Sequence, residues 1–182
     1  MIVVKLMGGI GNQMFQYSFA KQLSLKQGVD LKLDISELNG KLVNEKYSIR
    51  DFELNNFNIN ASVASENEIK AFQKNKFGKL MDLVLLYLPF NNKKRYIREP
   101  YFRFFKKALS VNGNAYLDGY WQTEKYFEGI RIELLKDFTL KTELSEKSKE
   151  IANKVLTQQA VSIHVRKGDY LSIEENKSLF AV

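Results

Sequence analysis

The first 35 residues carry a pattern typical of a strand–helix–strand unit. Residues 2–7 form a short apolar run, and a glycine-rich turn at residues 8–11 follows it. Residues 12–27 repeat apolar side chains at helical spacing, and Gly28 supplies a helix stop. Residues 29–35 alternate apolar and polar side chains, which indicates a strand. The unit predicts a right-handed crossover between two parallel strands.

Later segments extend this pattern into an α/β fold. Ser65 and Glu68 form a capping box, and Thr123 can cap a second helix. Residues 39–60 are polar and predict a loop with a short strand. The further predicted elements are helices at residues 65–76, 124–137 and 143–156 and strands at residues 116–120 and 161–166.

The composition limits the chemistry of the chain. It has no cysteine and one histidine, which excludes disulfides, thiol nucleophiles and sites built from several histidines. No Asp-x-Asp pair is present, so a site for a nucleotide-bound divalent ion has weak support. We therefore expect a reaction without a resident metal.

The net charge of +7 leaves several partners open. It suits a phosphate-bearing substrate or an anionic membrane surface, or it serves solubility alone. Residues 91–107 interleave basic and aromatic side chains, which indicates a partly buried helix and loop or a peripheral membrane contact. No nucleic-acid-binding motif accompanies this charge.

Nothing in the sequence predicts a membrane span. The longest apolar run, residues 80–90, is broken by Asp82 and Pro89 and is too short to cross a bilayer. The first residues lack the basic leader of a signal peptide. We expect a cytoplasmic protein, with peripheral contact to the cytoplasmic membrane face as the further option.

The glycine turn at residues 8–11 is the first candidate site. Gly9 and Gly11 match the Gly-x-Gly part of a dinucleotide fingerprint, but a third glycine is missing. Glycines between a strand and a helix let backbone amides approach a ligand. Asp34 ends the next strand where such a site would hold a ribose. Three interpretations stay open: a tight packing turn, a nucleotide site and a site for a sugar acceptor.

The second candidate site runs from His164 to Asp169. Arg166 falls at the carboxyl end of a predicted strand, where ligands bind in open α/β sheets. Its planar guanidinium matches phosphate oxygens in pairs, and Lys167 adds a point charge. A solvated strand end followed by a turn is the other interpretation. A lone histidine such as His164 is more often structural than catalytic.

Three segments together resemble the α-1,2-fucosyltransferases of glycosyltransferase family 11. Residues 8–17, GGIGNQMFQY, resemble the N-terminal signature of that family. Residues 118–122, DGYWQ, followed by Tyr126 and Phe127, resemble its middle segment. Residues 164–170, HVRKGDY, resemble its His-x-Arg-Arg-x-Asp element, with Lys167 at the second basic position. The three motifs lie in the family's order along the whole chain.

The resemblance implies a fold of two facing Rossmann-like halves, the GT-B type. It also implies an inverting transfer of L-fucose from GDP-fucose to the 2-hydroxyl of a terminal galactose, without cofactor or metal. The partners would be GDP-fucose and a galactose-terminated oligosaccharide, including a lipid-linked one. The implied catalytic residues are Arg166, Asp169 and His164, and the implied binding residues are Arg166, Lys167, Gly9, Gly11, Asn12 and Gln13.

The expected organisation is an acceptor-side domain at residues 1–158 followed by an incomplete donor domain. Residues 159–182 would hold the first strand and the motif of the GDP-fucose-binding domain. A parallel strand needs a crossover and a neighbour, and neither fits after residue 166. We therefore expect the 182 residues alone to have little or no transferase activity. A nucleotide-binding oxidoreductase domain and a non-catalytic carbohydrate-binding domain stay open as other functions.

Overall fold

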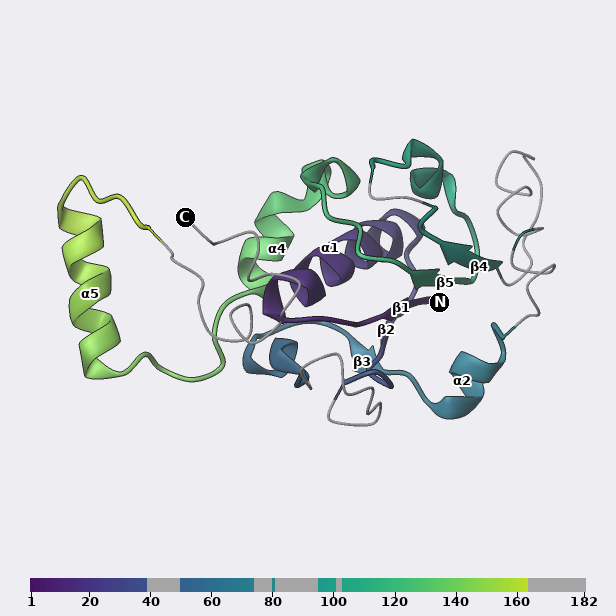
Figure 1. Cartoon of the computed structure of the whole chain (residues 1–182), viewed down its shortest axis with the longest axis horizontal. Coiled ribbons are helices and arrows are strands. Elements are labelled where there is room, and N and C mark those ends of the chain that lie inside the picture. The colour runs from purple at the N-terminus through teal and green to yellow at the C-terminus, as the bar shows by residue number, and fades with distance from the viewer. Residues whose placement is uncertain (39–49, 74–79, 81–94, 101–102, 164–182) are drawn as a thin grey trace, which may run out of the picture. The chain divides into compact units, whose positions relative to one another are not determined.

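The computed structural model describes residues 1–38, 50–73, 80, 95–100 and 103–163 (Figure 1). The chain divides into two compact units, Met1–Lys141 and Thr142–Val182. The domain boundary expected near residue 158 stays a prediction. The apolar run at residues 81–90 lies outside the described residues, as do residues 164–182.

A five-stranded parallel sheet forms the centre of the first unit, in the order β3-β2-β1-β5-β4. Ile2 of β1 stands opposite Leu31 on one side and Ala115 on the other. This arrangement confirms the predicted α/β class and the parallel pairing of the first two strands. The strands are β1 (Ile2–Lys5), β2 (Leu31–Asp34), β3 (Ser62–Val63), β4 (Arg95–Arg98) and β5 (Ala115–Asp118).

Helix α1 (Ile10–Gln27) connects β1 to β2 as the sequence predicts. It begins two residues earlier than expected, directly after Gly9, and ends at Gly28. Gly28 adopts a left-handed conformation with φ of 61°, and its N–H bonds back to the carbonyl of Leu25. Such a C-cap suits glycine because a Cβ disfavours positive φ.

The face of the sheet under α1 carries the larger core. Side chains alternate along each strand, so Ile2 and Val4 point to this face together with Leu33 and Leu117. Tyr17 and other apolar residues of α1 pack against them and are fully buried. Helix α4 (Arg131–Asp137) lies on the same side of the sheet as α1 (Figure 1).

The opposite face carries a smaller cluster built around aromatic rings. Val3, Tyr96 and Tyr116 are buried there with Phe72. The short helix α2 (Glu66–Lys70) precedes Phe72, and the predicted capping box between Ser65 and Glu68 is present. The helix is shorter than the expected 65–76, because the chain turns after Lys70 and places Phe72 in this cluster.

Two local predictions were wrong. Residues 95–98 form the strand β4, although the basic and aromatic composition of residues 91–107 suggested helix and loop. Residues 124–137 form two 3-10 turns, η3 (Glu124–Tyr126) and η4 (Glu128–Ile130), before α4 begins. Phe127 separates the two turns, with φ of −145° and ψ of 25° outside the helical region.

Short 3-10 helices complete the first unit: η1 (Glu53–Asn56) and η2 (Lys106–Ser110). The second unit contains α5 (Glu146–Thr157), whose N-cap Ser145 accepts a hydrogen bond from the Ser148 N–H. The strand expected at residues 161–166 is not formed in its described part, residues 161–163. A strand requires a hydrogen-bonding neighbour, and within the described ranges none pairs with these residues.

Candidate active site

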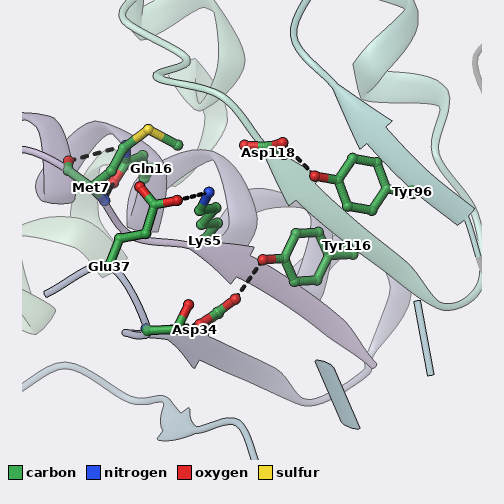
Figure 2. A network of polar contacts seen from close by, with 9 residues as sticks. Lys5, Met7, Gln16, Asp34, Glu37, Tyr96, Tyr116 and Asp118 are labelled. Atoms are coloured by element: carbon green, nitrogen blue, oxygen red, sulfur yellow. Dashed lines mark hydrogen bonds and ion pairs between the residues drawn. The ribbon is translucent and has the colours of Figure 1, made fainter. Parts of the chain in front are cut away.

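Parallel strands place their carboxyl ends at one edge of the sheet, and this edge is polar. Lys5, Asp34, Arg98 and Asp118 are the last residues of β1, β2, β4 and β5. Figure 2 shows Lys5, Asp34 and Asp118 among them. The chain runs from β1 through α1 to β2 on one side, whereas β5 and β4 lie on the other side. Ligands of open α/β sheets bind at the carboxyl edge where the order reverses, here between β1 and β5.

The glycine turn follows β1 at this reversal point. Gly8 has φ of 76°, and a Cβ there would lie 2.3 Å from Nδ2 of Asn12, so this position requires glycine. A Cβ on Gly9 or Gly11 would meet no atom of the described chain within 4 Å. These two glycines therefore leave backbone accessible at the start of α1, where a packing turn and a binding site were both open interpretations of the sequence.

Two buried glutamines hold the glycine turn in place. Gln13 donates to the carbonyls of Gly8 at 2.9 Å and Asp51 at 2.8 Å, and its Oε1 accepts from the N–H of Glu53 at 3.1 Å. Gln16 accepts from the N–H of Met7 at 3.0 Å. A direct contact from Gln13 to a ligand would have to replace one of these bonds. The sequence alone did not indicate that Gln13 and Gln16 form these hydrogen bonds within the protein.

Two tyrosine–aspartate pairs cross the face of the sheet opposite α1. The Tyr116 hydroxyl donates to Asp34, and the Tyr96 hydroxyl donates to Asp118 (Figure 2). The two rings stack with centroids 5.0 Å apart and an angle of 13° between their planes. The pairs join β4, β5 and β2 through side chains that stand close to the carboxyl edge.

Asp34 is fully engaged within the protein. It is 1 % exposed, one carboxylate oxygen accepts from Tyr116, and the other accepts from the N–H of Ser36 at 2.9 Å. A ribose bound by Asp34 would have to displace one of these partners. The geometry therefore gives no support to the dinucleotide site, with its ribose on Asp34, that the position of Asp34 in the sequence suggested.

Three tyrosine pKa values are raised above the ordinary value. Burial is the main cause at Tyr17, Tyr96 and Tyr116, and a hydrogen bond to a carboxylate adds to it in each case. The hydroxyl of Tyr17 donates to Asp137 at 2.5 Å. The neutral phenol is the form that these sites favour, because a buried phenolate beside a carboxylate would be desolvated and repelled.

We expect native protein to show nearly three fewer ionised tyrosines than urea-unfolded protein at about pH 11. Tyr17, Tyr96 and Tyr116 would be these groups, among nine tyrosines in the chain. Their folded pKa values are raised, so their contribution to stability is present below about pH 10 and is lost as pH rises through the folded values. Absorbance titration measures the difference. Tyr96→Phe should reduce the difference in ionised tyrosines by about one. Coincident titration curves for native and unfolded protein would contradict the prediction.

The first two sequence motifs meet at the reversal point between β1 and β5. Nε2 of Gln122, in the loop after β5, donates to Oδ1 of Asn12 near the start of α1 at 2.6 Å. Residues 8–17 and 118–122 therefore form one polar rim at the carboxyl edge. The predicted site residues His164, Arg166, Lys167 and Asp169 lie outside the described residues.

Glu99 lies outside these two motifs and supports the rim, and the sequence did not single it out. It follows β4, and its carboxylate accepts from the N–H groups of Tyr120 at 2.8 Å and Trp121 at 3.1 Å. No short motif marks Glu99, because its partners come 21 and 22 residues later in the chain. Only the pairing of β4 with β5 brings them together.

The described residues contain neither a cluster of metal ligands nor a membrane-crossing helix. No three carboxylate or histidine side chains there come together in a way that could hold a metal ion. Among the described helices, none is long and apolar enough to cross a membrane.

The chain is an α/β protein whose polar sheet edge is the place where enzymes of this architecture bind small molecules. A family model for glycosyl transferase family 11 matches residues 1–182, so the chain belongs to this family, as its three motifs predicted.

Two glycosyltransferases of Escherichia coli are similar to this chain in sequence. An alpha-1,2-colitosyltransferase is 32 % identical over 179 residues, which cover 94 % of this chain and 56 % of the relative. The O-antigen biosynthesis glycosyltransferase WbnK is 29 % identical over 185 residues, covering 92 % of this chain and 59 % of the relative. The chain thus spans between 56 % and 59 % of the length of these relatives. No solved structure matches the chain.

Proposed function

We propose that this chain provides the acceptor side of an inverting glycosyltransferase of the GT-B type. The enzyme moves L-fucose from GDP-fucose to the 2-hydroxyl of a terminal galactose. The observation that carries the proposal is the meeting of the first two family motifs at one rim, through the bond from Gln122 to Asn12. The open space over Gly9 and Gly11 supports it, because a ligand can reach the backbone there.

The chemistry of the transfer gives roles to residues of the third motif. Negative charge builds on the leaving GDP as the bond to fucose breaks, and the guanidinium of Arg166 with the ammonium of Lys167 would stabilise that charge. The attacking hydroxyl of the acceptor gives up its proton, for which Asp169 and His164 are the candidates. These roles rest on the resemblance of residues 164–170 to the family element.

A second donor deserves a direct comparison, because the 32 % identical relative is named for the transfer of colitose. Colitose is L-fucose without the 3-hydroxyl. A site that hydrogen-bonds this hydroxyl rejects the deoxy sugar strongly, whereas a site without such a partner distinguishes the two sugars poorly. GDP-colitose is therefore the second candidate donor.

The test uses the product of the complete gene, purified and incubated with lactose as a galactose-terminated acceptor. We expect transfer from GDP-fucose with release of GDP, and NMR should locate the new linkage at the 2-hydroxyl of galactose. The kcat/KM for GDP-fucose should exceed that for GDP-colitose. A preference for GDP-colitose would replace the donor, and failure of both donors with galactose acceptors would overturn the proposed function.

The proposal includes a cytoplasmic location and a lipid-linked acceptor at the membrane face. Its support is the net charge of +7 and a set of exposed basic side chains near β4. Arg95 of the same segment is buried at 4 % exposure and does not belong to this set. The exposed members are Arg98, Arg103, Lys106 and Lys107.

A further inference from the structure

The loop after β5 turns sharply against the end of β4. A Cβ on Gly119 would lie 2.4 Å from Cβ of Glu99 and 3.0 Å from Cε2 of Trp121, so glycine is required for this close approach. Glu99 also donates its own N–H to the carbonyl of Asp118 at 2.9 Å. The start of the loop is therefore fixed on β4 by Glu99 through both its backbone and its side chain.

Trp121 adopts a backbone conformation that its side chain disfavours. Its φ is 55°, and it is the one described residue other than glycine with a positive φ. The indole is fully buried, with ring centroids 4.7 Å from Phe19 and 5.5 Å from Tyr126. Strained backbone persists only where its surroundings hold it. Here the buried indole and the carboxylate of Glu99 hold it.

The strained turn presents the amide of Gln122 to the rim. Gln122 is exposed, and it bonds to Asn12 across the reversal point of the sheet. Within the described part of the chain, Oε1 of Gln122 and Nδ2 of Asn12 have no partner. The pair thus keeps one acceptor and one donor available, and a sugar hydroxyl both donates and accepts.

We propose that Glu99 is a positioning residue that fixes this turn so that the Asn12–Gln122 amide pair binds hydroxyls of the acceptor sugar. The inference rests on the proposed function and specifies its acceptor site. Both amides are uncharged, which suits a neutral pyranose such as galactose better than the diphosphate of the donor. Glu99 acts on the sugar only through the turn.

The test measures acceptor and donor kinetics of variants of the complete gene product, with lactose and GDP-fucose. Gln122→Ala removes an exposed side chain and should raise the KM for lactose about tenfold, with the KM for GDP-fucose unchanged. Asn12→Ala should have the same effect. Glu124→Ala, an exposed acidic residue two positions beyond Gln122, is the matched control and should leave both KM values unchanged.

Glu99 is tested by a pair of variants. Glu99→Ala should raise the KM for lactose about tenfold, whereas Glu99→Gln should have a KM for lactose close to that of the wild type. The glutamine oxygen can accept the same two backbone N–H groups, so recovery identifies a positioning role and excludes a need for the charge.

The outcomes separate the two proposals. Wild-type turnover with an unchanged lactose KM in Gln122→Ala and Asn12→Ala would overturn the inference and leave the proposed function intact. Glu99→Gln as impaired as Glu99→Ala would overturn the positioning role of Glu99. Wild-type protein that transfers neither sugar to lactose or to other galactose-terminated acceptors would overturn the proposed function, and the inference with it.

Discussion

Asp137→Asn is expected to lower the free energy of unfolding by about 3 kcal/mol. Asp137 ends α4 and forms an ion pair with Lys21 of α1 at 2.9 Å, and both side chains are buried. The same carboxylate accepts from the hydroxyl of Tyr17. Loss of the negative charge leaves the ammonium of Lys21 buried without a counterion, and such a charge is strongly destabilising. Urea unfolding followed by circular dichroism measures the change.

Two controls make this prediction specific. Glu133→Gln, an exposed carboxylate on the same helix, should change stability by less than about 0.5 kcal/mol. Lys21→Met combined with Asp137→Leu removes both charges and should recover part of the loss, because an apolar pair needs no counterion. The recovery should be incomplete, because the hydroxyl of Tyr17 loses its acceptor. Equal stability of Asp137→Asn and the wild type would show that this ion pair does not hold α4 on α1.

The strand–helix–strand unit was predictable because its signals are local. The apolar run at residues 2–7, the glycine turn and the stop at Gly28 each act within a few residues of the chain. The surroundings of α1 were not predictable in this way. Gln13, Gln16 and Lys21 are buried on it, although polar side chains on a helix usually indicate a solvent-facing side. Gln13 and Lys21 have partners far along the chain, Asp51 and Asp137, whereas Gln16 bonds to Met7, nine residues before it on the other side of the glycine turn.

The edge strand β4 was not predictable from the sequence either. Its residues Arg95 to Arg98 do not alternate between polar and apolar side chains, and the basic and aromatic residues around them suggested a partly buried helix and loop. Arg95 is nevertheless buried at 4 % exposure, and the hydroxyl of Tyr96 donates to Asp118. The pairing with β5 decides the structure of this segment, and pairing between distant segments leaves little trace in composition.

The candidate site was also predictable from the sequence only in part. The motifs at residues 8–17 and 118–122 were recognisable from the sequence, and the bond between Asn12 and Gln122 brings them together. Glu99 has no motif of its own, because its contribution depends on the sheet that places it beside the loop after β5. Sequence patterns therefore identified the two segments that meet at the rim and missed Glu99, which supports one of them.

Arg166→Ala in the product of the complete gene is expected to lower kcat for sugar transfer by about 10²- to 10³-fold. In the proposed reaction the leaving GDP would gain negative charge as its bond to the sugar breaks, and a planar guanidinium can bond two phosphate oxygens at once. Interactions that strengthen in the transition state act on kcat more than on KM. Turnover of GDP-fucose on lactose gives the rate, and thermal unfolding should show that the variant is folded.

Substitutions at the neighbouring positions separate charge from geometry. Arg166→Lys keeps the charge but loses the planar guanidinium, so its kcat should lie between those of Arg166→Ala and the wild type. Lys167→Ala removes a point charge and should lower kcat less than Arg166→Ala does. If Arg166→Ala turns over GDP-fucose as fast as the wild type, Arg166 has no part in stabilising the leaving group. The phosphates would then need another cation. A larger decrease of kcat in Lys167→Ala would identify Lys167 as that cation.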